Sequence, residues 1–198
     1  MKSYGLFATA TTVRIVLSFS ILILGWRYDQ PPFLILILAL LNDGTLMTIS
    51  SDRAQPSPKP EKWRLSELYC SAGALGLYLC LSTLLFFHVV YDTTFFDQQF
   101  GLQAPWRTSR NPNEAILHSI IYMQVSISGQ AMIFSTRSQT FWFLERPSAF
   151  LMVAFAFAQL VATLIGVYAN WGFTHIRGAG WGWAGAVWVW NIIWFIPM

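Results

Sequence analysis

The sequence predicts an all-α fold, that of a polytopic helical membrane protein with about six transmembrane helices. Composition is the first reason, because 55% of the 198 residues are hydrophobic and only 11% are charged. A soluble domain would carry about 25% charged residues. The second reason is that apolar runs recur near the ~20 residues needed to cross the hydrocarbon core of a bilayer. We therefore expect residues 1–198 to form one membrane domain.

Six spanning helices are expected, because turns and polar segments interrupt the apolar runs. The first run lacks a small-residue cleavage site, so we interpret it as a span rather than a removable signal. The second run follows a turn at residues 28–31, and the fourth begins after Glu114, whose negative charge suits a helix N-terminus. Tryptophans near the run ends are typical of an interfacial aromatic belt. The expected bounds are 4–26, 32–49, 67–90, 115–135, 148–169 and 181–197.

Lysine and arginine counts predict the topology. With a cytoplasmic N-terminus, seven basic residues lie in inside segments and four in outside loops. This excess agrees with the positive-inside rule. We therefore expect both termini in the cytoplasm, a cytoplasmic loop at 50–66 and an outer loop at 92–113.

Two charged residues lie inside apolar segments. Arg14 is in the first predicted span and Asp43 follows the apolar run 33–41 of the second. A carboxylate at the centre of a spanning helix costs about 2.5–3.5 kcal/mol, and such residues usually mark ion pathways. Arg14 lies about 15 residues before the turn and Asp43 about 13 after it. At ~1.5 Å per residue both are ~20 Å from the turn, so they share a depth near mid-membrane.

A carboxylate and a guanidinium at one depth could load and release a proton if their separation changed. Asn42 and Gly44 flank Asp43, and Thr45 follows. Gly and Asn weaken a helix locally, which would free backbone carbonyls and let the carboxylate meet water or a cation. The alternative is a structural ion pair that holds two helices together.

Other kinds of site are not indicated by the sequence. The basic residues are scattered, so no nucleic-acid partner is expected. No phosphate-binding Gly-rich loop, nucleophile elbow or metal-ligand spacing is present, so neither a cofactor nor a metal is expected in this chain. Gln124, Gln130 and Gln159 are expected to hydrogen-bond between helices. The expected partners are protons and the lipid bilayer.

Several long motifs carry a resemblance to a known family. The chain resembles the P-type plasma-membrane proton ATPases of plants and related eukaryotes, over essentially its whole length. The motifs are Leu41–Ser50, Asp52-Arg53, Pro56-Ser57-Pro58, Gln124–Ser128, Ile133–Ser138, Glu145-Arg146-Pro147, Ala158–Ile165, Val167–Trp171 and Gly178–Gly185.

The resemblance implies the last six of ten membrane helices of a plasma-membrane pump. By this resemblance Asp43 corresponds to the family's proton-carrying aspartate. Arg14 corresponds to the family's membrane-buried arginine, which acts as a counter-charge and hinders proton return. Asn42, Gly44 and Thr45 would support Asp43. The intact family uses ATP and Mg²⁺ and forms an aspartyl-phosphate.

The sequence also departs from the family. It lacks the phosphorylated DKTGT motif, the TGES loop, the nucleotide-binding domain and the first four membrane helices. In the family, one of these four helices carries an asparagine that is the partner of the proton-carrying aspartate. We therefore expect a fragment that is inactive as an ATPase alone, unless another chain supplies the missing pump domains. The alternative is a non-catalytic membrane scaffold or subunit derived from a truncated pump.

Overall fold

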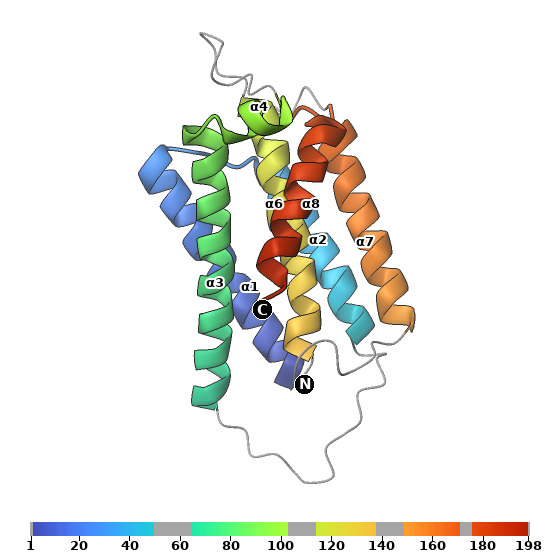
Figure 1. The fold of residues 1–198 in the computed structure, drawn as a ribbon. Coiled ribbons are helices and arrows are strands. Elements are labelled where there is room, and N and C mark those ends of the chain that lie inside the picture. The colour runs from blue at the N-terminus through green and yellow to red at the C-terminus, as the bar shows by residue number, and fades with distance from the viewer. Residues whose placement is uncertain (1, 50–64, 103–113, 138–148, 171–175, 198) are drawn as a thin grey trace.

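The computed structural model describes residues 2–49, 65–102, 114–137, 149–170 and 176–197. In these residues six long helices run alternately up and down through one bundle, and a short helix lies at one end of it (Figure 1). The helices are α1 (Lys2–Trp26), α2 (Pro32–Ile49), α3 (Leu65–Asp92), α4 (Phe95–Phe100), α6 (Glu114–Arg137), α7 (Ala149–Tyr168) and α8 (Gly180–Phe195). The described residues form helices and connections without a sheet, which confirms the all-α prediction.

Each of the six predicted spans coincides with a long helix, and no bound differs by more than two residues. Four of these helices, α1, α3, α6 and α7, are long and apolar enough to cross a membrane by length and composition. The apolar part of α2, Pro32–Thr45, is shorter, and α8 has 16 residues. The chain is therefore a helical membrane protein. The predicted cytoplasmic loop at 50–66 lies largely outside the described residues, as does the second half of the predicted outer loop, residues 103–113.

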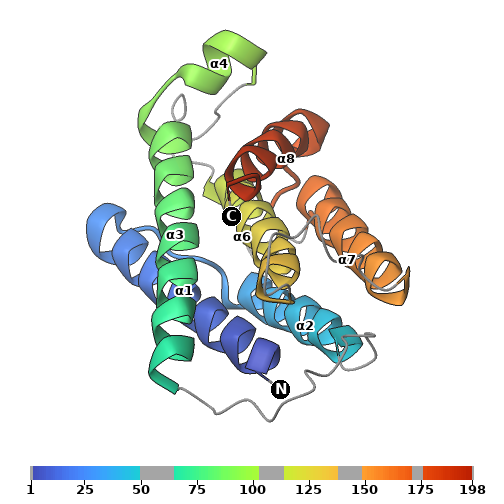
Figure 2. The ribbon, with the colours of Figure 1, turned by 60° about the horizontal axis from the view of Figure 1, so that its bottom comes forward.

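Helix α6 is the central element of the bundle. It contacts α1, α2, α3, α7 and α8, which surround it in the view along the bundle (Figure 2). Its side chains are buried from Leu117 to Gln130, although this stretch includes glutamines and serines. A helix that is buried on all sides in this way presents its polar groups to neighbouring helices rather than to lipid.

Helices α1 and α3 pack most closely where small residues meet. Gly76 on α3 lies against Ala10 on α1, and a Cβ atom at Gly76 would lie 2.9 Å from the Ala10 carbonyl oxygen. Ala10 and Ala72 are fully buried at this contact. Small residues of this kind let two backbones approach within a membrane. The contact fixes α1 against α3 and so determines which neighbours the middle of α1 meets.

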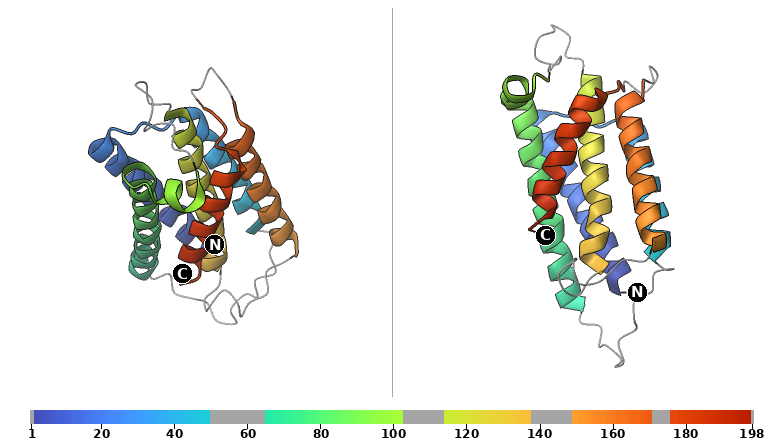
Figure 3. Two further views of the ribbon diagram at one scale, coloured as in Figure 1. Left: turned by 45° about the horizontal axis from the view of Figure 1, so that its top comes forward. Right: turned by 45° about the vertical axis from the view of Figure 1, so that its right-hand side comes forward.

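Aromatic side chains pack the end of the bundle that carries α4. Phe96 of α4 lies 5.5 Å from the Trp183 ring and 6.1 Å from the Phe86 ring, between centroids. The right-hand view of Figure 3 places α4 beside the end of α3, at the far end of the bundle from the N-terminus. The N-terminal end of α1 and the C-terminal end of α8 point toward the opposite end of the bundle (Figure 1).

Candidate functional site

Arg14 is the middle residue of α1 and is buried inside the bundle, with 1% of its surface exposed. Its Nη1 donates a hydrogen bond to the Val125 carbonyl oxygen of α6 at 3.1 Å. Its Nη2 donates to the Thr83 hydroxyl of α3 at 3.3 Å and to the Ser128 hydroxyl of α6. One guanidinium therefore joins three helices at the centre of the fold.

All three acceptors of Arg14 are uncharged. Among the described residues no carboxylate lies within ion-pair distance of the guanidinium, and Arg14 Nε is buried without a hydrogen-bond partner. A cation removed from water loses several kcal/mol of solvation that neutral acceptors replace only in part. The site is therefore a buried positive charge with spare hydrogen-bonding capacity.

The α2 residue that approaches this site is Asn42. A Cβ atom built on Gly129 of α6 would lie 3.2 Å from Arg14 Nη1 and 3.8 Å from Asn42 Oδ1. Arg14 and Asn42 therefore lie at one level, against the same glycine. Asn42 has 5% of its surface exposed, and its Oδ1 has no hydrogen-bond partner among the described residues. The absence of a side chain at Gly129 makes room for both polar groups.

Asp43 lies on a different side of α2. Its side chain is exposed, beside the exposed apolar residues Leu36, Leu40 and Met47, and no ion pair joins it to Arg14. Successive helical residues are about 100° apart around the axis, so only one of Asn42 and Asp43 can face α6. The charged pair considered from the sequence is thus not a contact in this structure; the two residues share a depth but not a face.

The backbone of α2 is helical throughout Pro32–Ile49, so the weakening expected at Asn42 and Gly44 does not interrupt the helix. Gly44 is exposed beside Asp43. Thr45 is buried, and its hydroxyl donates to the Leu41 carbonyl oxygen at 2.8 Å. The carbonyl groups beside Asp43 therefore belong to an unbroken helix in this structure and are not freed as we expected from Asn42 and Gly44.

Sequence reasoning missed Thr83, Ser128 and Gly129, which shape the Arg14 site. For Gly129 a signal was present, since small and polar residues interrupt the apolar ones along Gln124–Gln130 of α6. The predicted cross-helix bonding holds for Gln159, whose Nε2 donates to the Ile127 carbonyl oxygen at 3.2 Å. The side chains of Gln124 and Gln130 are buried and have no hydrogen-bond partner among the described residues.

Within the described ranges, no group of three or more His, Cys, Asp or Glu residues is placed to hold a metal ion. A comparison of the chain with models of known protein families finds no match. The groups that the chain itself brings to this site are a buried guanidinium, neutral hydroxyls and amides around it, and a carboxylate one residue from Asn42.

Proposed function

We propose that this chain is the C-terminal transmembrane part of a P-type proton-exporting ATPase that couples ATP hydrolysis to proton transport across the plasma membrane. Asp43 is the proton carrier, and Arg14 is the counter-charge that gates it. The phosphorylation, nucleotide-binding and actuator domains, with ATP and Mg²⁺, belong to other parts of the pump. The proposal starts from the motifs that resemble this family.

The observation that carries the proposal is that Arg14 is buried among groups that would still have hydrogen-bond partners without it. Without Arg14, the Thr83 hydroxyl would still donate to the Leu79 carbonyl oxygen, and the Ser128 hydroxyl would still donate to the Gln124 carbonyl oxygen. No acceptor would be left unpaired, so the fold gains little from a charge that is expensive to bury. A residue that stability does not require supports a role in ion movement.

The position of Asp43 also supports a role in transport. In a bilayer the exposed face of α2 would leave this carboxylate among Leu36, Leu40 and Met47, next to lipid. That placement is costly unless another helix or water meets the carboxylate. The resembling family has further membrane helices beside this one, including one with an asparagine partner for the aspartate. We propose that one of those helices covers Asp43 in the intact pump, which would explain why the carboxylate is exposed in this chain.

A non-catalytic membrane scaffold remains the second candidate, since Arg14 joins α1, α3 and α6 by hydrogen bonds. A scaffold would need Arg14 for stability, whereas a pump would need it for coupling. Stability and transport can be measured separately, so the two roles are distinguishable.

The proposal is tested by rebuilding the pump around this chain. The isolated chain should not hydrolyse ATP, because its sequence lacks the DKTGT motif whose aspartate is phosphorylated in the resembling family. Joined to the cytoplasmic domains and first four helices of a family member, it should restore vanadate-sensitive hydrolysis and acidify the trans side of vesicles. Phosphoenzyme formation by the chain alone, or a correctly folded hybrid that hydrolyses ATP without moving protons, would contradict the proposal.

A further inference from the structure

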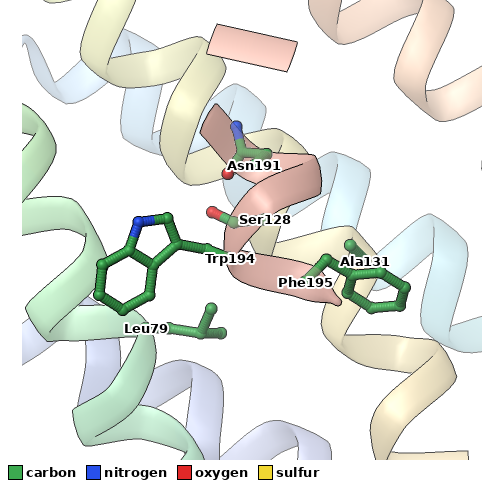
Figure 4. Close-up of a pocket in the computed structure, with 6 residues that line it drawn as sticks. All are labelled: Leu79, Ser128, Ala131, Asn191, Trp194 and Phe195. Atoms are coloured by element: carbon green, nitrogen blue, oxygen red, sulfur yellow. The ribbon is translucent and has the colours of Figure 1, made fainter. Parts of the chain in front are cut away.

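A small cavity lies beside Ser128, which accepts a hydrogen bond from Arg14, between α3, α6 and α8. It is lined by Leu79, Ser128, Ala131, Asn191, Trp194 and Phe195. The room open to the centre of a water molecule is about 10 Å³, close to the minimum that one bound water needs. Figure 4 shows the side-chain oxygens of Ser128 and Asn191 turned toward each other above Leu79.

The polar group that lacks a partner here belongs to Asn191. This residue has 6% of its surface exposed. Its Nδ2 donates to the Val187 carbonyl oxygen at 2.9 Å, which fixes the orientation of the amide. Its Oδ1 is consequently directed away from that carbonyl and is buried without a partner among the described residues. An unpaired buried acceptor costs about 1–3 kcal/mol, so a donor in the cavity would be stabilising.

Ser128 supplies the second acceptor. Its hydroxyl hydrogen is used in the bond to the Gln124 carbonyl oxygen. One lone pair of its oxygen accepts from Arg14 Nη2, and a hydroxyl oxygen has two. The remaining lone pair is available to a donor in the cavity.

The charge and the hydrogen-bonding groups around the cavity indicate which kind of ligand fits it. A cation would lie near the positive charge of Arg14, which donates a hydrogen bond to Ser128, and an anion would meet two acceptor oxygens. A neutral molecule with two donors and the size of the cavity satisfies both oxygens. We propose that one water molecule binds here, donating to Asn191 Oδ1 and Ser128 Oγ, and that it joins α8 to the hydrogen-bond network of Arg14.

This inference is independent of the proposed function, since it concerns only the contacts of α8. The bound water can be detected by radiolytic hydroxyl labelling followed by mass spectrometry, with the purified chain in lipid nanodiscs. Under irradiation an ordered internal water generates radicals beside the side chains that it touches, and those side chains are labelled. Leu79 lines the cavity and has 3% of its surface exposed, whereas Leu22 is fully buried in the apolar core. Leu79 should be labelled faster than Leu22.

Two variants and a control complete the experiment. Asn191→Leu fills the cavity and removes the acceptor, and Ser128→Ala removes the other acceptor with little change in volume. In both variants the labelling rate of Leu79 should fall toward that of Leu22. Gln159→Leu removes a buried amide on α7, away from the cavity lining, and should leave the rate unchanged. A wild-type Leu79 labelled no faster than Leu22, or a rate that both variants leave unchanged, would overturn the proposal.

Discussion

The Arg14 guanidinium of α1 and the Asn42 amide of α2 both lie against Gly129 of α6, at one level of the bundle. The Gly129 Cβ position lies 3.2 Å from Arg14 Nη1 and 3.8 Å from Asn42 Oδ1. The same geometry turns Asp43 to the exposed face of α2. The α2 residue that shares the Gly129 position with Arg14 is thus the neighbour of the carboxylate and not the carboxylate itself.

Gly129→Leu should therefore destabilise the chain by about 1–3 kcal/mol, because the new side chain needs the space that Arg14 and Asn42 occupy. Unfolding of the purified protein in mixed micelles measures this free energy. The cost should be smaller in an Asn42→Ala background, where part of that space is free. Gly73→Leu on α3 is the control, since no atom lies within 4 Å of its Cβ position. Equal costs at both glycines would contradict the placement.

Gly76→Ala should weaken the packing of α1 against α3. A Cβ there would lie 2.9 Å from the Ala10 carbonyl oxygen, a backbone atom that cannot rotate away. We expect a loss of about 1–3 kcal/mol in the free energy of unfolding. Gly73→Ala, one turn earlier on the same helix, should be neutral or stabilising by up to ~1 kcal/mol through helix propensity. A stabilising Gly76→Ala would show that the two helices are not in close contact.

Arg14→Met and Ser128→Ala should have opposite consequences for stability. Methionine fills similar space, leaves each former acceptor with its own helix partner, and removes a costly buried charge, so the chain should be unchanged or more stable. Ser128→Ala leaves the guanidinium with fewer acceptors and should cost about 1–3 kcal/mol. Thermal unfolding in detergent compares the two. A large loss on Arg14→Met would favour the scaffold role.

Asp43→Leu should stabilise the isolated chain in a bilayer. An exposed carboxylate near mid-membrane costs about 2.5–3.5 kcal/mol, and leucine at the same position would remove that cost. The extent of membrane insertion during translation, measured by glycosylation tags, should rise. If insertion is unchanged, Asp43 is already solvated or paired in the isolated chain.

Cysteine labelling tests the predicted topology. In a background without Cys70 and Cys80, a cysteine at Gln98 on α4 should react with an impermeant maleimide only from outside the cell. A cysteine at Ser66, at the start of α3, should react only from the cytoplasmic side; both side chains are exposed. The reverse pattern would invert the orientation expected from the positive-inside rule.

The helices were predictable because each is a long apolar run with polar residues or proline at its ends. The Arg14 site was predictable only in part. A charge inside an apolar segment is visible in the sequence, and equal distances from the turn placed Arg14 and the Asn42-Asp43 pair at one depth. The rotation of α2 about its axis was not predictable, because the residues before Asn42 are apolar on every side and mark no inward face. Thr83 and Ser128 were missed because isolated hydroxyls in spanning helices commonly bond their own backbone.

The most direct test of the proposed pump is proton transport per ATP hydrolysed in the rebuilt full-length enzyme carrying Asp43→Asn. Asparagine keeps the size and hydrogen bonding of the side chain but cannot carry a proton, so transport should be lost even where some hydrolysis survives. Asp29→Asn, in the turn between α1 and α2, is the control and should leave the ratio unchanged. An Asp43→Asn enzyme that transports protons at the wild-type ratio against a membrane potential would contradict the assignment of Asp43 as the carrier.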